Sequence, residues 1–187
     1  MTVSFRSMGD VTTTDLLSQA HAGSAEAWSE LVERYARLVW SIVRGYRLDA
    51  ATAADVSQTV WLRLVEHLDR IRDPERLAGW LATTARNESL RALRRSARER
   101  PVAVFEDRAD DVADPGDGLI AAEERDRLLA ALDTLEVSCR ELLRLTCADP
   151  PLDYQTIARI IDRPIGSIGP TRARCLERLR RALEATP

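Results

Sequence analysis

Apolar side chains recur at helical spacing along most of the chain, and the alternation typical of a β-strand is nearly absent. The clearest pattern lies in residues 28–46, where apolar positions fall at i, i+3, i+4 and i+7. They are Trp28, Leu31, Val32, Tyr35, Leu38, Val39, Ile42, Val43 and Tyr46. Ser24 stands where an N-cap belongs and Gly45 lies near the far end, so we predict one long amphipathic helix between them.

Two shorter patterns flank this helix. A short helix is predicted over residues 16–20, ended by Gly23. A third helix follows Asp49 or Thr52, since Thr52 and Asp55 have the spacing of a capping box. Its predicted inner face carries Val56, Val60, Trp61, Leu64 and Leu68.

A loop over residues 69–73 leads into a fourth predicted helix. Asp73 and Pro74 have the order of an N-cap followed by proline in the first turn, and the pattern reaches about Arg98. Pro101 ends it, and the acidic stretch with Pro115, Gly116 and Gly118 predicts an irregular linker.

Helical patterns resume at Leu119 and continue to the C-terminus. Ser138 and Glu141 have capping-box spacing for a helix that runs to about Cys147. Asp153 then caps a short helix over residues 154–161. A turn over residues 162–166 precedes a last helix over residues 168–183.

The predicted fold is therefore all-α, with two helical domains joined by an acidic flexible linker. The domains are residues 1–100, with four helices, and residues 119–187; the linker is residues 101–118.

Charge is unevenly distributed, although the chain of 187 residues has a net charge of only −3. Residues 86–100 hold six Arg against two Glu, and residues 159–181 hold seven Arg against two acids. Between them, residues 106–126 hold nine acids against two Arg. Two basic stretches indicate two contacts with a polyanion. The acidic stretch is either a solvated linker or a mimic of a nucleic-acid backbone inside a basic channel.

Several chemistries are excluded or disfavoured. The chain has no Lys, which excludes a Schiff-base or P-loop lysine. Its two His and three Cys lack metal-ligand spacing, so we expect no metal and no cofactor. An odd number of Cys in a soluble Arg-rich chain indicates a reducing cytosol rather than a disulfide framework. No apolar run of ~18 residues predicts a membrane span, and Met1 to Asp10 lacks a secretory signal. We therefore expect a cytoplasmic protein that is not an enzyme.

The C-terminal pair of helices has the plan of a helix-turn-helix: a short helix, a tight turn and a longer Arg-rich helix. Ala158 supplies the small residue at the helix crossing, and Ser167 is a candidate cap for the second helix. Pro170 then falls in the first turn, where its missing N–H costs no intrahelical bond. The alternative is an ordinary helical hairpin with an arginine-coated surface.

A second candidate site follows the outer face of the fourth helix. Its members fall within about 80° of arc at 100° per residue. They are Trp80, Thr83, Asn87, Arg91, Arg94 and Arg98. Such a stripe can bind a nucleic-acid strand, because the Arg side chains contact phosphates and the aromatic ring stacks on a base. The alternative is a solvated charged face, with Trp80 in the core beside Leu77 and Leu81.

Three stretches together resemble the extracytoplasmic-function (ECF) type of bacterial RNA polymerase sigma factor. They are AADVSQTVWLRLVEHL at 53–68, LAGWLATTARNESLRALRR at 77–95 and DYQTIARIIDRPIGSIGPTRARCLERLR at 153–180. The resemblance covers nearly the whole chain apart from about ten N-terminal residues.

The resemblance implies a role for each stretch. Asp55, Gln58 and Trp61 match the surface that docks on the clamp coiled coil of core RNA polymerase, whose flap is a second expected contact. The second stretch resembles the region that opens the minus-10 promoter element, with matches at Trp80, Leu81, Ala85, Arg86 and Asn87. Taken together with the helical stripe, the expected minus-10 contacts are Trp80, Thr83, Arg86, Asn87, Arg91 and Arg94. The loop over residues 69–76 would hold a flipped base. The third stretch resembles the helix-turn-helix that recognises the minus-35 element. In its turn, this chain has Asp162 at the position where the family usually has glycine.

The last helix carries the expected minus-35 contacts on one side and a buried face on the other. The buried face is Ile168, Cys175, Leu176, Leu179 and Leu183. The opposite face is Pro170, Arg174, Glu177 and Arg181, with Thr171 and Arg178 at one edge. The expected minus-35 contacts are Ser167, Pro170, Thr171, Arg174, Arg178 and Arg181. Arg174 is the candidate for a guanine contact, whereas Arg178 and Arg181 are expected to meet phosphates.

The chain is thus expected to be a sigma factor that binds core RNA polymerase, reads a two-part promoter and helps melt promoter DNA, with no small-molecule substrate. The family is often held inactive by an anti-sigma factor, which the sequence itself does not reveal. One alternative is an autonomous helix-turn-helix regulator whose residues 1–100 sense a signal or dimerise. Another is an interaction protein that binds a helical partner and no DNA.

Overall fold

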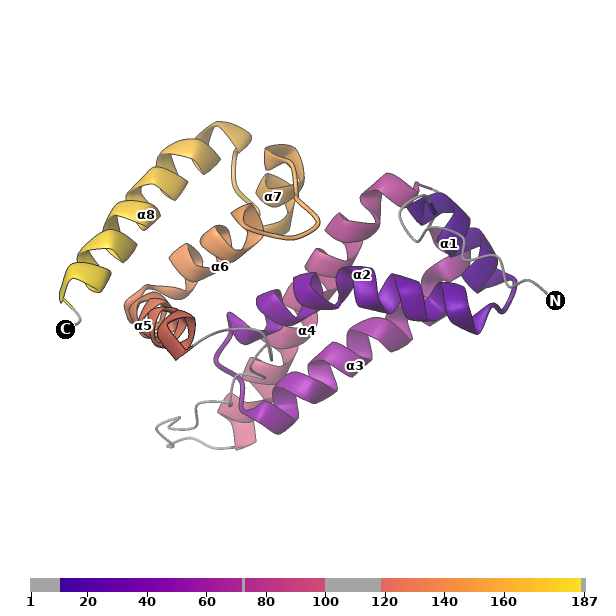
Figure 1. Cartoon of the computed structure of the whole chain (residues 1–187), viewed down its shortest axis with the longest axis horizontal. Coiled ribbons are helices and arrows are strands. Elements are labelled where there is room, and N and C mark those ends of the chain that lie inside the picture. The colour runs from indigo at the N-terminus through magenta and orange to yellow at the C-terminus, as the bar shows by residue number, and fades with distance from the viewer. Residues whose placement is uncertain (1–10, 72, 100–118, 186–187) are drawn as a thin grey trace.

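The computed structural model describes residues 11–71, 73–99 and 119–185, and over these ranges the chain is all-α, as predicted (Figure 1). The α-helices are α1 (Thr13–His21), α2 (Ala25–Arg44), α3 (Ala50–His67), α4 (Leu77–Glu99), α5 (Leu119–Thr134), α6 (Val137–Thr146), α7 (Tyr154–Ile160) and α8 (Ile168–Ala185). Three 3₁₀-turns join them: η1 (Leu68–Arg70), η2 (Pro74–Arg76) and η3 (Ile165–Ser167).

Side-chain caps explain where several helices begin. Ser24 accepts the N–H of Ala27 at the start of α2, as predicted. Asp153 accepts the N–H of Thr156 at 2.8 Å at the start of α7, also as predicted. Each cap satisfies one backbone donor that the first helical turn leaves open.

Both predicted capping boxes are wrong. Asp49, rather than Thr52, caps α3, because the N–H and hydroxyl of Thr52 both donate to the Asp49 carboxylate. Helix α6 begins at Val137 after Glu136, so Ser138 lies inside the helix. The Glu141 carboxylate is engaged by side chains of α4 and of the segment after α2, and it does not return to its own helix end.

Helices α1–α4 form one bundle around an apolar core. Helices α2 and α3 both pack against α4, and α1 packs across α2 (Figure 1). The inward side chains follow the predicted periodicity; those fully buried include Leu31, Leu38, Val39, Val43, Val60, Leu64, Leu77 and Leu81.

Helices α5–α8 form a smaller unit, in which α8 packs on α5 and α6. The apolar core of the N-terminal bundle continues into this unit through Leu142, Leu145, Ile157, Ile160 and Ile168. Figure 1 shows α6 and α7 on the side that faces α2 and α4, with α8 outermost. The domain boundaries at 1–100 and 119–187 stay a prediction, and the linker over 101–118 lies outside the described residues.

Two kinds of feature are absent from the part of the chain that the structure describes. None of its helices combines the length and apolar character needed to cross a membrane. No group of three or more His, Cys, Asp or Glu side chains is arranged to hold a metal ion.

Candidate nucleic-acid interface

One side of α4 presents polar and basic side chains to solvent. Asp73 and Pro74 set the approach to this helix: the Asp73 carboxylate accepts the N–H of Glu75 at 3.2 Å, and Pro74 opens η2 just before α4. The exposed residues of the predicted stripe are Thr83, Asn87, Arg91, Arg94 and Arg98. Their common exposure agrees with the helical spacing, and their contact with DNA stays a prediction.

Trp80, the remaining member of the stripe, is half-buried. Its indole packs against the bundle core, and its ring centroid lies 6.1 Å from that of His67 at the end of α3, with a tilt of 41°. The His67 ring is in turn within 3.0 Å of the Arg63 carbonyl oxygen through Nδ1. The packing of Trp80 agrees with its interpretation as a core residue, and stacking of its partly exposed ring on a base stays a prediction.

The arginines of α4 differ in how they are engaged. Arg91 pairs with the buried Glu88 at 2.6 Å, and Glu88 also holds Arg63 of α3 at 2.8 Å. Arg86 lies off the exposed stripe, and its Nε donates to Glu141 of α6 at 2.5 Å. Two of the predicted minus-10 residues thus have acidic partners inside the protein.

Helices α7 and α8 form the predicted helix-turn-helix. Ala158 and Ile168 are buried where the helices meet, and the Arg163 N–H closes the turn on the Ala158 carbonyl at 2.9 Å. Asp162 has φ +53°, the left-handed conformation expected where the resembling family has glycine. Asp162 therefore adopts the backbone conformation that the turn requires, although it is not a glycine.

The outer side of α8 carries the predicted minus-35 residues. Pro170, Arg174, Arg178 and Arg181 are exposed, and the Arg174 guanidinium donates to the Thr171 hydroxyl at 3.2 Å. Farther along, Arg178 lies 3.5 Å from the Glu136 carboxylate. Arg174 is therefore held near the start of α8, where a recognition helix meets base edges.

An acidic side chain stands among the phosphate candidates of α8. Arg180 and Arg181 both donate to the Glu177 carboxylate at 3.0 Å. The bonds from Arg180 and then from Arg181 lower the pKa of Glu177 to about 2. Glu177 is thus charged at neutral pH and orders both guanidinium groups along the helix.

Two predictions about α8 are wrong. The Ser167 hydroxyl does not cap the helix; it donates to the Pro164 carbonyl at 2.7 Å, because η3 occupies the turn that precedes α8. Leu176 is 39% exposed and lies outside the buried face, because α5 and α6 cover the opposite side of the helix. Cys175 is buried as predicted.

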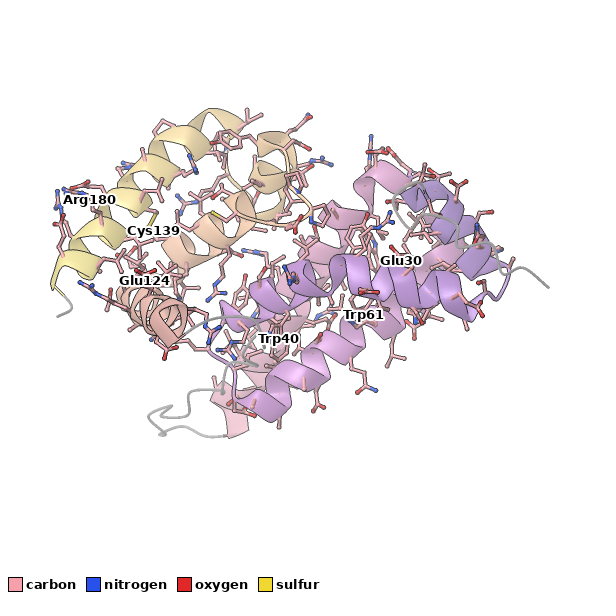
Figure 2. The ribbon with its side chains drawn as sticks, in the orientation of Figure 1. Glu30, Trp40, Trp61, Glu124, Cys139 and Arg180 are labelled. Carbon is pink, nitrogen blue, oxygen red and sulfur yellow. A yellow bond between two sulfur atoms is a disulfide. The ribbon has the colours of Figure 1, made fainter. Side chains whose placement is uncertain are left out.

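Cys139 of α6 and Cys175 of α8 form a disulfide, which contradicts the expectation of reduced cysteines. The two Cα atoms are 5.4 Å apart, and both residues are buried in a small cluster with Leu135 and Leu143. Figure 2 shows Cys139 between α6 and α8. The pair lacks any local motif, since 36 positions separate the cysteines; Cys147 is free and exposed.

The outer face of α3 carries the predicted polymerase contacts. Asp55 and Gln58 are exposed, and Trp61 is half-buried with its ring 6.4 Å from that of Trp28, edge to face. Two apolar residues that the sequence analysis missed, Leu62 and Val65, are each 56% exposed.

These five residues of α3 fall within an arc of about 120° at 100° per residue. Placing the pattern on a helical wheel reveals this set, because Leu62 and Val65 lie between Asp55 and Trp61. A mixed apolar and polar face that the bundle leaves uncovered is typical of a protein interface.

The chain is similar to known sigma factors. Residues 31–99 match the family Sigma-70 region 2, which defines the class of the N-terminal bundle. The ECF RNA polymerase sigma factor SigL of Mycobacterium tuberculosis (strain H37Rv) is 34% identical over 123 residues, 65% of this chain and 64% of SigL. The probable RNA polymerase sigma factor RfaY of Xanthomonas campestris pv. campestris is 27% identical over 135 residues, 69% of this chain and 34% of RfaY. The chain thus spans between about a third and just under two thirds of these relatives.

Solved structures share the fold. CnrH, in complex with the cytosolic domain of CnrY, aligns with a TM-score of 0.64 and 21% identity over 92% of this chain and 97% of that one. The sigma factor RpoE, in complex with the anti-sigma factor NepR from Bartonella quintana, aligns with a TM-score of 0.66 and 23% identity over 83% and 96%. These structures show that the chain shares the fold of sigma factors, and the sequence matches show that it is similar to ECF RNA polymerase sigma factors.

Proposed function

We propose that this protein is a non-catalytic initiation factor that binds core RNA polymerase, directs it to two-part promoters and helps open the DNA. The observation that carries the proposal is the exposed stripe of α4, from Thr83 to Arg98, inside the segment that matches Sigma-70 region 2. Because polymerase acts in the cytoplasm, we expect the protein to act there too.

The face of α3 is the proposed polymerase contact. Exposed Leu62 and Val65 supply apolar area, while Asp55 and Gln58 supply polar groups at its edge. An interface of this composition, an apolar centre with a polar rim, fits the clamp coiled coil of the polymerase. The flap of the polymerase is the proposed partner of the C-terminal unit.

Promoter opening is proposed to occur at α4. Extruding a base costs a few kcal/mol, and stacking on an aromatic ring returns about 1–3 kcal/mol per base. The partly exposed Trp80 is the proposed stacking platform, with Asn87 about two turns farther along the same face and Arg91 and Arg94 on the phosphates. The helix-turn-helix reads the minus-35 element as a duplex, through the start of α8.

The experiment compares Trp80→Ala and Asn87→Ala on duplex and pre-melted promoter templates with core polymerase. Loss of one stacked base should reduce opening on duplex DNA by about 1–3 kcal/mol, roughly 5- to 150-fold, with much less effect on polymerase binding. A pre-melted bubble should rescue Trp80→Ala. Trp40→Ala is the matched control, since it removes another half-buried indole of the same core, from α2.

If the pre-melted template gives no rescue, Trp80 acts only through packing and the proposed stacking is wrong. An electrophoretic mobility assay separates the other functions. Tight, sequence-specific duplex binding without polymerase would instead indicate an autonomous helix-turn-helix regulator. Absence of DNA binding under both conditions would indicate a protein-interaction role.

A further inference from the structure

The disulfide between Cys139 and Cys175 has no part in the proposed contacts with polymerase or DNA. It joins α6 to α8 across 36 sequence positions, and the two residues are 4% and 1% exposed. A reducing cytoplasm keeps most thiols reduced, and the disulfides that do form there are usually transient bonds of catalysis or redox sensing. In a protein that acts with a cytoplasmic polymerase, this bond is therefore expected to form and break.

A cation lies against one of the two sulfur atoms. The Arg178 guanidinium of α8 donates to the Sγ of Cys139 at 3.9 Å, and the same Nη1 atom lies 3.5 Å from the Glu136 carboxylate. A guanidinium beside a cysteine sulfur stabilises the thiolate, which is the reactive form of cysteine. Cys139 is thus the better nucleophile of the pair, and Cys175 is the thiol placed to resolve what Cys139 forms.

The surroundings of the bond favour a small oxidant. The two sulfur atoms lie in an apolar cluster between α6 and α8, and the Arg178 side chain beside Cys139 is 54% exposed. A protein oxidant would have to displace a helix to touch either sulfur. Hydrogen peroxide is little larger than water, so a small movement of the Arg178 side chain gives it access to Cys139.

The bond lies behind the predicted DNA-reading side of α8. Cys175 is buried and directly follows Arg174, the exposed candidate for the guanine contact. The start of α8 is anchored separately, because Ile168 is fully buried in the main core. Farther along, the packing of α8 around the bond is limited to the small cluster with Leu135 and Leu143. Loss of the bond should therefore loosen the middle of α8 while its start stays anchored.

We propose that Cys139 and Cys175 are a reversible oxidation site for hydroperoxides, and that their bond fixes the recognition helix α8 on α6. The oxidised pair holds α8 in the arrangement of Figure 1, and the reduced pair leaves its middle loosely held. The proposal rests on the proposed function for its cytoplasmic setting and for the role of α8.

Oxidation proceeds in two steps. The Cys139 thiolate attacks one oxygen of the hydroperoxide, the O–O bond breaks, and the other oxygen leaves as water or an alcohol after taking a proton, so that Cys139 becomes a sulfenic acid. The Cys175 thiol then attacks the sulfenic sulfur and loses its proton, and the expelled hydroxide leaves with that proton as water. The two cysteines thus lose two electrons to the peroxide. A protein dithiol reverses the reaction by thiol–disulfide exchange and itself becomes a disulfide.

The first experiment measures the oxidation of the full chain in a Cys147→Ser background, which removes the exposed thiol. Reduced protein, whose helix content is checked by circular dichroism, is treated with hydrogen peroxide, and the remaining thiols are alkylated and counted by mass spectrometry. The Cys139–Cys175 bond should form. With Cys175→Ser added, the reaction should stop at the sulfenic acid of Cys139, which dimedone traps.

Two arginine variants test the role of the cation in this reaction. Arg178→Gln should slow the oxidation roughly fivefold, because the thiolate loses its stabilising charge. Arg180→Gln is the matched control, since it removes an exposed guanidinium of the same helix that pairs with Glu177. Its oxidation rate should equal that of the background protein.

The second experiment measures how firmly α8 is held, by amide hydrogen exchange of the oxidised and reduced forms. Amides of residues 172–183 should exchange roughly tenfold faster or more in the reduced form. This added exchange should depend little on low urea concentrations, because a local opening exposes much less surface than global unfolding does. The double variant Cys139→Ala with Cys175→Ala should exchange like the reduced form, with or without peroxide.

The proposal is overturned if peroxide leaves both thiols reduced, or if only a disulfide oxidant such as oxidised glutathione forms the bond. Equal oxidation rates in Arg178→Gln and Arg180→Gln, or equal exchange of α8 in the two redox forms, would also contradict it. Neither experiment contains DNA or polymerase. A failed transcription assay with the redox response intact would therefore count against the proposed function alone.

Discussion

Breaking the Cys139–Cys175 disulfide should destabilise the protein markedly. The bond joins α6 to α8 and closes a loop with a sequence separation of 36. The chain-entropy relation for such a loop gives about 4 kcal/mol at 25 °C. The rest of that local cluster is small, with buried Leu135 and Leu143 and partly buried Leu132 and Leu179, so little apolar packing compensates for the loss.

The expected shift in melting temperature follows from the size of the cooperative unit. The core runs from the N-terminal bundle into the C-terminal unit, so we expect one transition for the whole chain. For a chain of this length, 1 kcal/mol shifts Tm by about 2–4 °C, so full reduction should lower Tm by roughly 8–16 °C.

Differential scanning calorimetry with and without a phosphine reductant measures this shift. The Cys147→Ser background removes the exposed thiol that would exchange with the bond. The control combines Cys139→Ala with Cys175→Ala, and its Tm should not respond to the reductant. A Tm that changes by less than about 2 °C on reduction, or three free thiols in the unreduced wild-type protein, would contradict a stabilising Cys139–Cys175 bond.

Three other predictions concern the two DNA readers and the polymerase contact. Arg174→Ala should relax base preference at one minus-35 position by ~1–3 kcal/mol, whereas Arg181→Ala should weaken all promoters alike and reduce the salt dependence, as binding to single-base promoter mutants would show. Leu62→Ala with Val65→Ala should weaken binding to core polymerase by at least tenfold and leave Tm nearly unchanged, because both side chains are exposed; fluorescence anisotropy measures the affinity. Asp153→Ala should destabilise the helix-turn-helix by about 0.5–2 kcal/mol through loss of the α7 cap. The N–H of Thr156 lowers the pKa of Asp153, so the stabilisation is present above about pH 4 and is lost as the pH falls through the folded value; urea titrations across that range test it.

Local patterns were sufficient to predict the helices. The 3.6-residue period gave α2 from Ser24 to Gly45, and an aspartate followed by polar residues gave the start of α7. Asp162 shows that even a turn without glycine was predictable, because its side chain tolerates positive φ. In each case the determining interactions lie within one helical turn or one loop.

Contacts between distant residues were not predictable from local patterns. Ser138 and Glu141 had the right spacing for a capping box, yet Arg86 and Tyr46 engage the carboxylate from elsewhere in the chain. The partner of Cys139 was hidden for the same reason, since no motif links it to α8.

The faces that stay uncovered were only partly predictable. Leu176 has the spacing of a buried residue, but the neighbouring helices meet the other side of α8. Leu62 and Val65 resemble core residues by type, and only the arrangement of the bundle shows that they face outward. A single sequence shows the helical period of the apolar residues. It does not show which side of a wide apolar face packs against a neighbouring helix.

The most direct test of sigma activity is run-off transcription from a pool of promoter fragments, with purified core polymerase in the presence and absence of this protein. We expect a small set of discrete transcripts that require both components and whose templates share two sequence elements at a fixed spacing. A transcript pattern that is the same with and without the protein would contradict the proposed function.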